Sequence, residues 1–230
     1  PRFNYCSLSS MGGDIADINN DGNLDIFTTD MLPADNYRLQ TTIAFDPYHL
    51  EDQKYRENFY YQMTQNCLHI NDGSGYFQET GFLSGVAATD WSWGALIFDF
   101  ENDGNKDIFI SNGIIKDIMD RDFLDFYTDR IKIKNFVERK GRFDYRDFIP
   151  MMPAKPLENY AFQNNGTLTF HNQAAELGLA DPSFSNGAAY GDLDNDGDMD
   201  LVVNNENSIC FVYRNETGSR SGNHYLKIRF

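Results

Sequence analysis

Three nine-residue stretches of the chain crowd acidic side chains around a central glycine. They read DINNDGNLD (residues 17–25), DFENDGNKD (99–107) and DLDNDGDMD (192–200), and together they hold 12 of the 35 acidic residues. Side chains at positions 1, 3 and 5 of a tight turn can bring their oxygen atoms to one point, and glycine at position 6 permits the sharp bend. Like charges held this close repel one another unless a cation lies between them. The spacing therefore predicts three cation sites.

The ligand chemistry favours Ca²⁺, because this hard cation accepts six to eight oxygen ligands in irregular geometry. An EF-hand shares the first six positions but requires a bidentate glutamate at position 12 and a helix on each side. Here position 12 is Thr28, Ile110 or Val203, each inside an apolar run, so an EF-hand is excluded. A hairpin turn of the Asn-Gly or Asp-Gly kind that binds no metal is the alternative. Three copies in register favour calcium.

The acidic turns belong to a longer internal repeat. A shift of 93 residues places eleven residues between Asn66 and Asp107 on identical residues between Asn159 and Asp200. A shift of 82 residues places eight residues between Ser10 and Phe27 on identical residues between Ser92 and Phe109. Each unit has a run of small residues before the turn, an apolar run after it, and further short β-rich runs. This pattern predicts a four-stranded antiparallel sheet for each unit.

Radially stacked four-stranded sheets form a β-propeller. We therefore predict an all-β fold, a β-propeller fragment of about three blades, because closed propellers have 4–8 blades. The small residues before each turn suit strands that neighbouring backbones approach closely. Since a blade takes about 40 to 50 residues, the offsets require insertions, at residues 31–63 and 113–157, between the second and third strands. Turns and insertions are then expected on opposite faces.

The second insertion contains six apolar residues that approximate one helical stripe. We expect this helix to lie on the sheets and be buried there, and a helix dedicated to binding a partner is the alternative. Aromatic residues of the first insertion, within residues 45–61, either form a local core or a contact surface for protein or glycan. The residues of the stripe are Ile114, Ile118, Phe123, Phe126, Ile131 and Ile133.

Charge and composition narrow the function. The net charge of −16 repels phosphate backbones, so nucleic acid is a poor partner. No run of about 18 apolar residues exists, so no membrane-spanning segment is expected. The four histidines show no catalytic or metal-ligand spacing, and no nucleophile motif is present. We therefore expect a binding module that is not an enzyme. A propeller enzyme that acts on polysaccharide through paired carboxylates is the alternative.

The three turns resemble the calcium loops of FG-GAP (VCBS-type) repeats, which are best known from the integrin α-subunit propeller. Residues 14–38, 89–113 and 185–205 look like the large secreted VCBS-repeat proteins of Bacteroidetes, and residues 222–230 look like the opening strand of an ASPIC/UnbV domain. The resemblance implies a calcium-bearing propeller outside the cytoplasm (secreted, periplasmic or on the cell surface) that binds an extracellular protein or glycan in adhesion. We expect residues 1–230 to be part of a longer protein, with any signal peptide outside this fragment.

The resemblance also implies a set of calcium ligands, which is carried over by position. Positions 1, 3, 5 and 9 supply side chains, and position 7 supplies its backbone carbonyl. Glu101 departs from the usual Asp or Asn at position 3 and is expected to crowd the second site. The implied ligands are Asp17, Asn19, Asp21, Asn23 and Asp25; Asp99, Glu101, Asp103, Asn105 and Asp107; and Asp192, Asp194, Asp196, Asp198 and Asp200.

Overall fold

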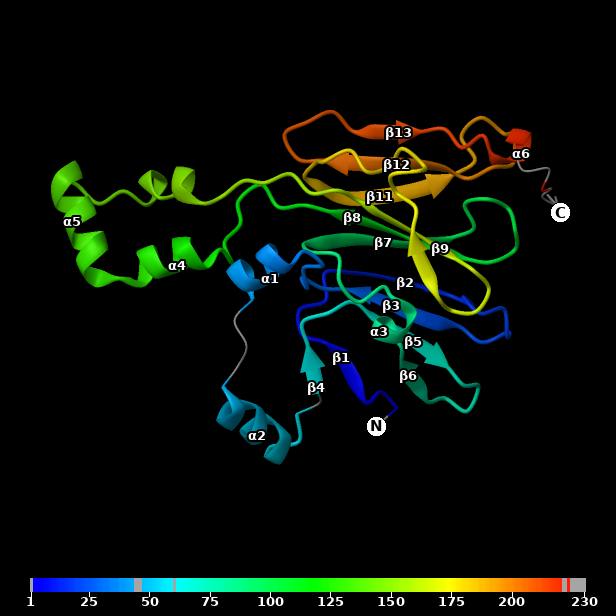
Figure 1. Cartoon of the computed structure of the whole chain (residues 1–230), viewed down its shortest axis with the longest axis horizontal. Coiled ribbons are helices and arrows are strands. Elements are labelled where there is room, and N and C mark those ends of the chain that lie inside the picture. The colour runs from blue at the N-terminus through cyan, green and yellow to red at the C-terminus, as the bar shows by residue number, and fades with distance from the viewer. Residues whose placement is uncertain (1, 44–46, 60, 221–222, 224–230) are drawn as a thin grey trace.

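The computed structural model describes residues 2–43, 47–59, 61–220 and 223. These residues form three antiparallel sheets, one for each acidic turn, which confirms the prediction of a mostly β fold (Figure 1). The predicted opening strand at residues 222–230 lies, except for Asn223, outside the described residues. Among the described residues, no helix combines the length and the apolar character that crossing a bilayer requires.

Each sheet follows the chain order of its unit. The first sheet has the order β2 (Gly12–Ala16), β3 (Asp25–Thr29), β5 (Cys67–Asn71), β6 (Phe77–Glu79). The second has the order β7 (Ser92–Phe98), β8 (Asp107–Asn112), β9 (Tyr160–Asn164), β10 (Phe170–Asn172). The third has the order β11 (Ser185–Gly191), β12 (Asp200–Asn205), β13 (Phe211–Tyr213). Within the part of the chain described here, the third sheet thus has three strands and not the four that were predicted.

The acidic turns join the first and second strands of each sheet in one register. The last paired residue before the turn faces position 9 of the turn in all three hairpins, at Ala16–Asp25, Phe98–Asp107 and Gly191–Asp200. The second and third strands of the three sheets also pair in equivalent register. Phe27 faces Leu68, Phe109 faces Ala161, and Val202 faces Val212. The repeat in the sequence is therefore a repeat in three dimensions.

Two apolar cores lie between the three sheets. In the first core, Phe27 and Leu68 of the first sheet pack against Ile97 and Ile108 of the second. The second core is built the same way between the second and third sheets, where Phe109 and Ala161 pack with Leu201 and Val203. Because both faces of the second sheet are covered, all six residues of β8 are buried, as expected for a strand between two cores.

The first strands of the three sheets are neighbours, and small residues let them approach. A Cβ atom on Gly12 would lie 1.9 Å from the carbonyl oxygen of Trp93, and one on Gly94 would lie 3.3 Å from the backbone nitrogen of Ala188. These contacts confirm the predicted crowding of β2 and β7. Gly187 in β11 has nothing within 4 Å among the described residues, so crowding on this strand is not observed.

Both insertions leave a second strand and return to a third strand, so they lie at the end of the sheets opposite the acidic turns (Figure 1). Residues 31–63 contain α1 (Asn36–Thr42), α2 (Tyr48–Arg56) and β4 (Tyr61–Met63), which pairs in parallel with β1 (Tyr5–Ser7). Residues 113–157 contain α4 (Arg121–Thr128), α5 (Arg130–Lys140) and the 3-10 turns η1 (Tyr145–Asp147) and η2 (Ile149–Met151). The short helices α3 (Gly81–Ser84) and α6 (Thr217–Arg220) follow β6 and β13.

The second insertion corrects one prediction. It does not lie on the sheets as one helix, and it extends away from them as an arm that ends in α5 (Figure 1). The helix breaks at Asp129, whose backbone is extended and whose carboxylate accepts the N–H groups of Ile131 and Lys132. Aspartate at this position caps a new helix and does not continue the old one. The apolar stripe is therefore broken: Phe123 and Phe126 lie in α4, Ile131 and Ile133 lie in α5, and the first two residues of the stripe precede both helices.

Arg38 of α1 fixes both insertions to the sheets. Its guanidinium binds Asp90, which precedes β7, through two nitrogens at 2.7 and 2.8 Å, and Asp117 at the base of the arm at 2.6 Å. All three side chains are buried. Removal of one member of a buried charge cluster leaves uncompensated charge in a medium that solvates it poorly.

We predict that Arg38→Met lowers the free energy of unfolding by about 3–5 kcal/mol, because the carboxylates of Asp90 and Asp117 lose their cation. Urea denaturation measures the change. Arg56→Met on α2 is the matched control, since the exposed Arg56 pairs with Asp52 at 2.7 Å on the surface and such pairs contribute little. Equal losses in the two variants would contradict the anchoring role of Arg38.

Candidate metal sites

The three acidic turns share one backbone conformation. The glycine at position 6 has φ of 90° in Gly22, 92° in Gly104 and 95° in Gly197. This is a region in which residues with a Cβ are strained, so the predicted role of the glycine is confirmed. Position 4 is left-handed as well, with φ of 59°, 54° and 63° at Asn20, Asn102 and Asn195. Asparagine tolerates this conformation. Its recurrence at position 4 of all three turns is the feature of the sequence that could have predicted the left-handed backbone there.

Position 9 of each turn is a buried aspartate that joins the turn to the third strand. One carboxylate oxygen accepts the N–H of position 2 in the same turn, and the other accepts an N–H from an asparagine at or just after the end of the third strand. The pairs are Ile18 at 2.9 Å and Asn71 at 2.8 Å for Asp25; Phe100 and Asn164, both at 2.8 Å, for Asp107; and Leu193 at 2.9 Å and Asn215 at 2.8 Å for Asp200.

Burial makes the charge on these aspartates costly. It raises the pKa of Asp107 to about 8, although the N–H groups of Phe100 and Asn164 act in the opposite direction. The neighbouring carboxylates Glu101 and Asp99 raise this pKa further. Burial likewise raises the pKa of Asp25, and the charges of its own turn add to the shift. A bound cation would offset this repulsion, which is the chemistry of a metal site.

The carboxylates at position 1 of the first two turns shape the turn. Asp17 accepts the N–H groups of Asp21 at 3.0 Å and Gly22 at 2.9 Å. Asp99 accepts those of Asp103 at 3.1 Å and Gly104 at 2.8 Å. These bonds direct the position-1 carboxylate into the turn.

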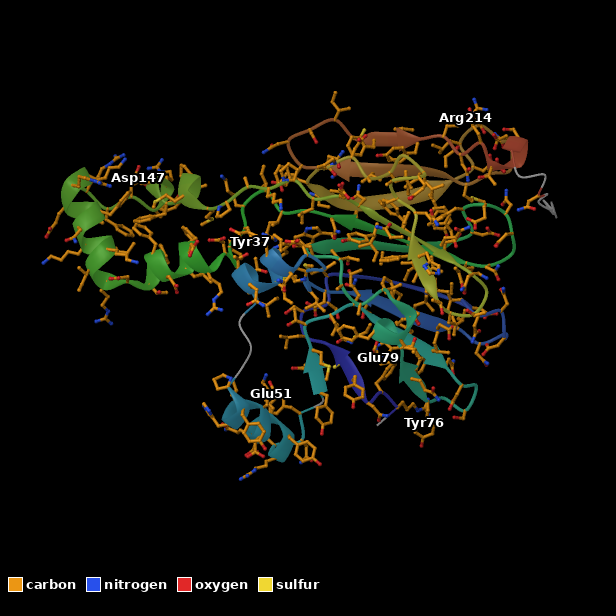
Figure 2. The ribbon with its side chains drawn as sticks, in the orientation of Figure 1. Tyr37, Glu51, Tyr76, Glu79, Asp147 and Arg214 are labelled. Carbon is orange, nitrogen blue, oxygen red and sulfur yellow. The ribbon has the colours of Figure 1, made fainter. Side chains whose placement is uncertain are left out.

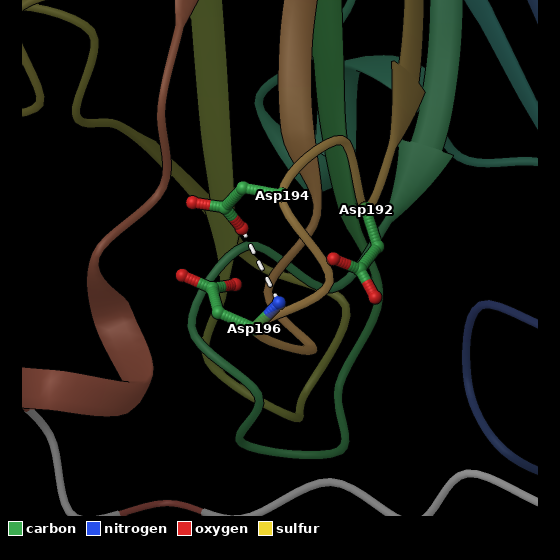
Figure 3. A group of neighbouring side chains, drawn as sticks. All are labelled: Asp192, Asp194 and Asp196. Atoms are coloured by element: carbon green, nitrogen blue, oxygen red, sulfur yellow. Dashed lines mark hydrogen bonds between the residues drawn. The ribbon is translucent and has the colours of Figure 1, made fainter.

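The third turn brings three carboxylates together. Asp192, Asp194 and Asp196 each offer one oxygen, and these oxygens lie within 4.8 Å of one another (Figure 3). Two oxygens bound to one Ca²⁺ at 2.3–2.6 Å are at most about 5 Å apart, so the spacing fits this ion. Among the described residues, no other three acidic, histidine or cysteine side chains approach one another this closely.

The other two predicted residues of the third turn are placed differently. Asp200 is bonded to the backbone as described above. The side chain of Asp198 is buried and accepts Asn102 Nδ2 at 2.7 Å and the N–H of Gly218 at 2.6 Å. Its carboxylate thus links the third turn to the second turn and to α6. The predicted use of its backbone carbonyl as a ligand stays a prediction.

In the second turn, Glu101 is turned toward the third strand. Its carboxylate accepts a hydrogen bond from Gln163 Nε2 in β9. Burial raises the pKa of Glu101, the bond from Gln163 lowers it, and Asp103 and Asp99 raise it. In the first turn the carboxylate count is lower, because position 3 is Asn19, whose side-chain nitrogen donates to Asp21 at 3.0 Å. The three turns therefore differ in their donor sets.

Side-chain amides link the three turns into a row. Asn20 Nδ2 in the first turn donates to the carbonyl of Gly104 in the second at 2.9 Å. Asn164 Nδ2 donates back to the carbonyl of Ile18 at 3.2 Å, and Asn215 Nδ2 donates to that of Phe100 at 2.7 Å. The turns thus form one continuous end of the molecule. Sequence reasoning did not find these asparagines as a functional set.

A cation of the protein itself lies beside the third turn. Arg214 follows β13, and its Nε lies 2.8 Å from Asp194 Oδ2 while its Nη2 lies 3.7 Å from Asp196 Oδ2. The side chain is exposed, and Figure 2 shows it at the end of the molecule opposite the arm. Arg214 therefore offsets part of the negative charge of the turn with the most carboxylates.

Comparison with known proteins agrees with this repeat. A profile of the FG-GAP-like repeat matches residues 154–203, a segment that contains β9, β10, β11, the third acidic turn and most of β12. Comparison with the curated proteins gives no match. An FG-GAP-like repeat is therefore present in this part of the chain, and the matched pattern includes the turn whose carboxylates converge.

We predict that Asp200→Ala destabilises the fold itself, whereas Asp196→Ala affects ion binding alone. In the presence of a chelator, Asp200→Ala lowers the free energy of unfolding by about 2–4 kcal/mol, because two backbone N–H groups lose their acceptor. The exposed Asp196 does not accept such a pair of backbone N–H groups. Asp196→Ala is therefore expected to leave the free energy of unfolding in chelator unchanged. Chemical denaturation in chelator measures both variants. Equal stability of the two variants would contradict the structural role of position 9.

Proposed function

We propose that this chain is a calcium-binding β-propeller module that works outside the cytoplasm, is not an enzyme, and binds a protein or glycan ligand. The observation that carries the proposal is the convergence of three carboxylates in the third turn, within an architecture repeated in register in the other two. The FG-GAP-like match over the same turn supports it.

The residues suit calcium because all donors are carboxylate, amide or backbone oxygens. In each turn the side chains of positions 1, 3 and 5 would hold the ion, position 7 would add a carbonyl, and position 9 would complete the set. Each carboxylate oxygen of position 9 has a second lone pair beyond the N–H it accepts. When bound, the ion supplies positive charge that offsets the repulsion within the turn and holds the hairpin closed.

The propeller proposal rests on one face of the third sheet, which the described residues leave exposed. Residues at position 2 of the turn fill the cores between sheets, with Ile18 1% and Phe100 8% exposed, whereas Leu193 is 60% exposed. Val212 occupies the register position of the buried Leu68 and Ala161, and it is 62% exposed. On this face the third sheet has apolar residues at the positions through which each of the other two sheets packs against the next sheet. We infer that a further sheet covers it, as successive blades do.

The acidic turns also support the two other parts of the proposal, a location outside the cytoplasm and the absence of catalysis. Exposed loops of this kind bind calcium with dissociation constants on the order of 10⁻⁴ to 10⁻³ M in extracellular modules, so free calcium in the cytosol would leave them empty. The 12 acidic residues of the three turns have the spacing of metal ligands. We propose that no reaction is catalysed. Hydrolysis or elimination on a panel of polysaccharides by the full chain would contradict this.

We predict that millimolar Ca²⁺ raises the melting temperature relative to chelator, because an ion that binds the folded state stabilises it by mass action. Calorimetric or fluorescence melting measures the shift. The triple variant Asp21→Ala/Asp103→Ala/Asp196→Ala is the control, since it removes the central carboxylate of each turn and is expected to melt at one temperature in both conditions. A melting curve of the unchanged protein that does not respond to calcium would contradict the metal assignment.

We predict that Arg214→Gln tightens calcium binding at the third turn by roughly threefold, because a competing cation is removed from Asp194 and Asp196. Isothermal titration in low salt measures the affinity, and the difference between the two proteins is expected to shrink in high salt. Weaker binding in Arg214→Gln would show that Arg214 orders the carboxylates and does not compete with the ion.

A further inference from the structure

The arm formed by residues 113–157 carries charge opposite to that of the rest of the molecule. Residues 130–146, which we call the basic tip, contain seven Lys and Arg and two acidic residues. Their net charge is +5 in a chain whose net charge is −16. The basic tip comprises α5 and the segment that leads into η1, and it is the part of the arm farthest from the sheets (Figure 1).

The arm is a folded unit with a core of its own. Phe148 is buried, and the centroid of its ring lies 5.0 Å from that of Phe136, 5.6 Å from Tyr127 and 5.8 Å from Phe143. The base of the arm is closed by the N–H of Asp117, which donates to the carbonyl of Pro153 at 2.9 Å. These aromatic contacts give the outer part of the arm a core of its own, while Arg38 joins the base of the arm to the sheets through Asp117.

The cations of the basic tip are presented to solvent. Lys132 and Lys134 are more than half exposed, and their nearest carboxylates, Asp129 and Glu138, are 3.9 and 3.7 Å away. Arg130 and Arg139 are exposed and form no ion pair with any residue that the structure describes. Surface pairs of this length contribute little, so these charges remain available to an anionic ligand.

Flat apolar side chains lie among these cations. Tyr145 is 66% exposed and has the guanidinium of Arg146 5.8 Å from its ring centroid, and Phe143 is 62% exposed. On α5, Ile131 is 72% exposed between the basic residues. Exposed aromatic rings offer a face for stacking on a flat ligand surface. Arg146 itself donates to Asp144 at 3.0 and 3.1 Å, so charge-assisted hydrogen bonds to a ligand would come from the arginines of α5, which pair with no acidic residue that the structure describes.

We propose that the basic tip binds an anionic polysaccharide, one that carries sulfate or carboxylate groups, with Tyr145 stacked on a sugar ring. The recognition is electrostatic, because a polyanion is attracted to the basic tip and repelled by the acidic rest of the chain. The inference names a ligand class for the proposed binding module and in that respect rests on the proposed function. It also assigns a role to the arm that the calcium turns do not share.

The geometry of α5 favours a polysaccharide over a membrane surface. A helix that lies in a bilayer interface exposes one apolar face, whereas Ile133, Phe136 and Val137 are partly buried toward the core of the arm. Lys132 and Arg139 lie on one flank of the outward face and Arg130 and Lys134 on the other, as the helical period requires. Cations on both flanks suit a chain that crosses the helix.

The test compares dextran sulfate with uncharged dextran, which has the same sugar backbone, as probes of the full chain. We expect binding of dextran sulfate that weakens in high salt, and none of dextran. Lys132→Gln/Arg139→Gln is expected to raise the dissociation constant about tenfold, and glutamine preserves helix propensity. Lys54→Gln/Arg56→Gln on α2 is the matched control, with an expected change below about twofold. Equal effects of the two double variants would overturn the proposal.

Three further measurements separate the polysaccharide from other polyanions. Tyr145→Ala is expected to weaken binding of dextran sulfate severalfold even in high salt, while Tyr48→Ala on α2 leaves it unchanged, because only the former removes a ring from the basic tip. Binding of phosphatidylglycerol vesicles without binding of dextran sulfate would overturn the proposal in favour of a membrane. Binding of duplex DNA as tightly as dextran sulfate, with no effect of Tyr145→Ala, would overturn it in favour of charge alone.

The calcium-dependent shift in melting temperature is recorded on the same proteins. If the shift persists but dextran sulfate does not bind, the inference about the arm is wrong and the calcium sites stand. If dextran sulfate binds through the basic tip but calcium causes no shift, the calcium sites are wrong and the arm stands. The two results are independent because Asp147 of the arm and Arg214 beside the third turn lie at opposite ends of the molecule (Figure 2).

Discussion

Each acidic turn depends on one buried carboxylate that accepts one N–H from its own turn and another from the third-strand side of its sheet. Asp25, Asp107 and Asp200 make these bonds at 2.8–2.9 Å. A charge held away from water is costly, and burial raises the pKa of Asp107 to about 8. The turn nevertheless stays closed, because the alternative would leave two backbone N–H groups without an acceptor. In the third turn, Asp192, Asp194 and Asp196 are thereby held together despite their repulsion, which prepares that site for a cation.

The same arrangement divides the molecule into two ends. Asparagine side chains join the turns from sheet to sheet, as in Asn20 to Gly104 and Asn215 to Phe100, and this end is acidic. At the other end the insertions begin where the second strands stop, and Arg38 fixes them to the sheets through Asp90 and Asp117. The sheets between the two ends are covered by apolar cores.

Local patterns made much of this predictable. Glycine at position 6, apolar runs after each turn and the spacing of repeated residues indicated the hairpins, their register and the place of the insertions. Residues whose roles depend on distant partners were not predictable. The side chain of Asp198 bonds to Asn102 and Gly218, two partners that the spacing of the turn does not indicate. The expected buried helix is split because Asp129 caps α5. Its Phe126 contacts the ring of Phe148, a residue outside the helix that helical periodicity does not predict as a partner, whereas Ile131 is exposed. The cluster around Arg38 joins residues 52 and 79 positions apart.

The most direct test of the central claim is the number of calcium ions that one chain retains in equilibrium dialysis against millimolar ⁴⁵Ca²⁺. Three turns with one backbone conformation and one hydrogen-bonded position 9 predict three ions for each chain. Removal of the central carboxylate of one turn, as in Asp103→Ala, is expected to lower the number by one. A chain that retains no calcium, or one whose calcium content is unaffected by loss of these carboxylates, would contradict the account.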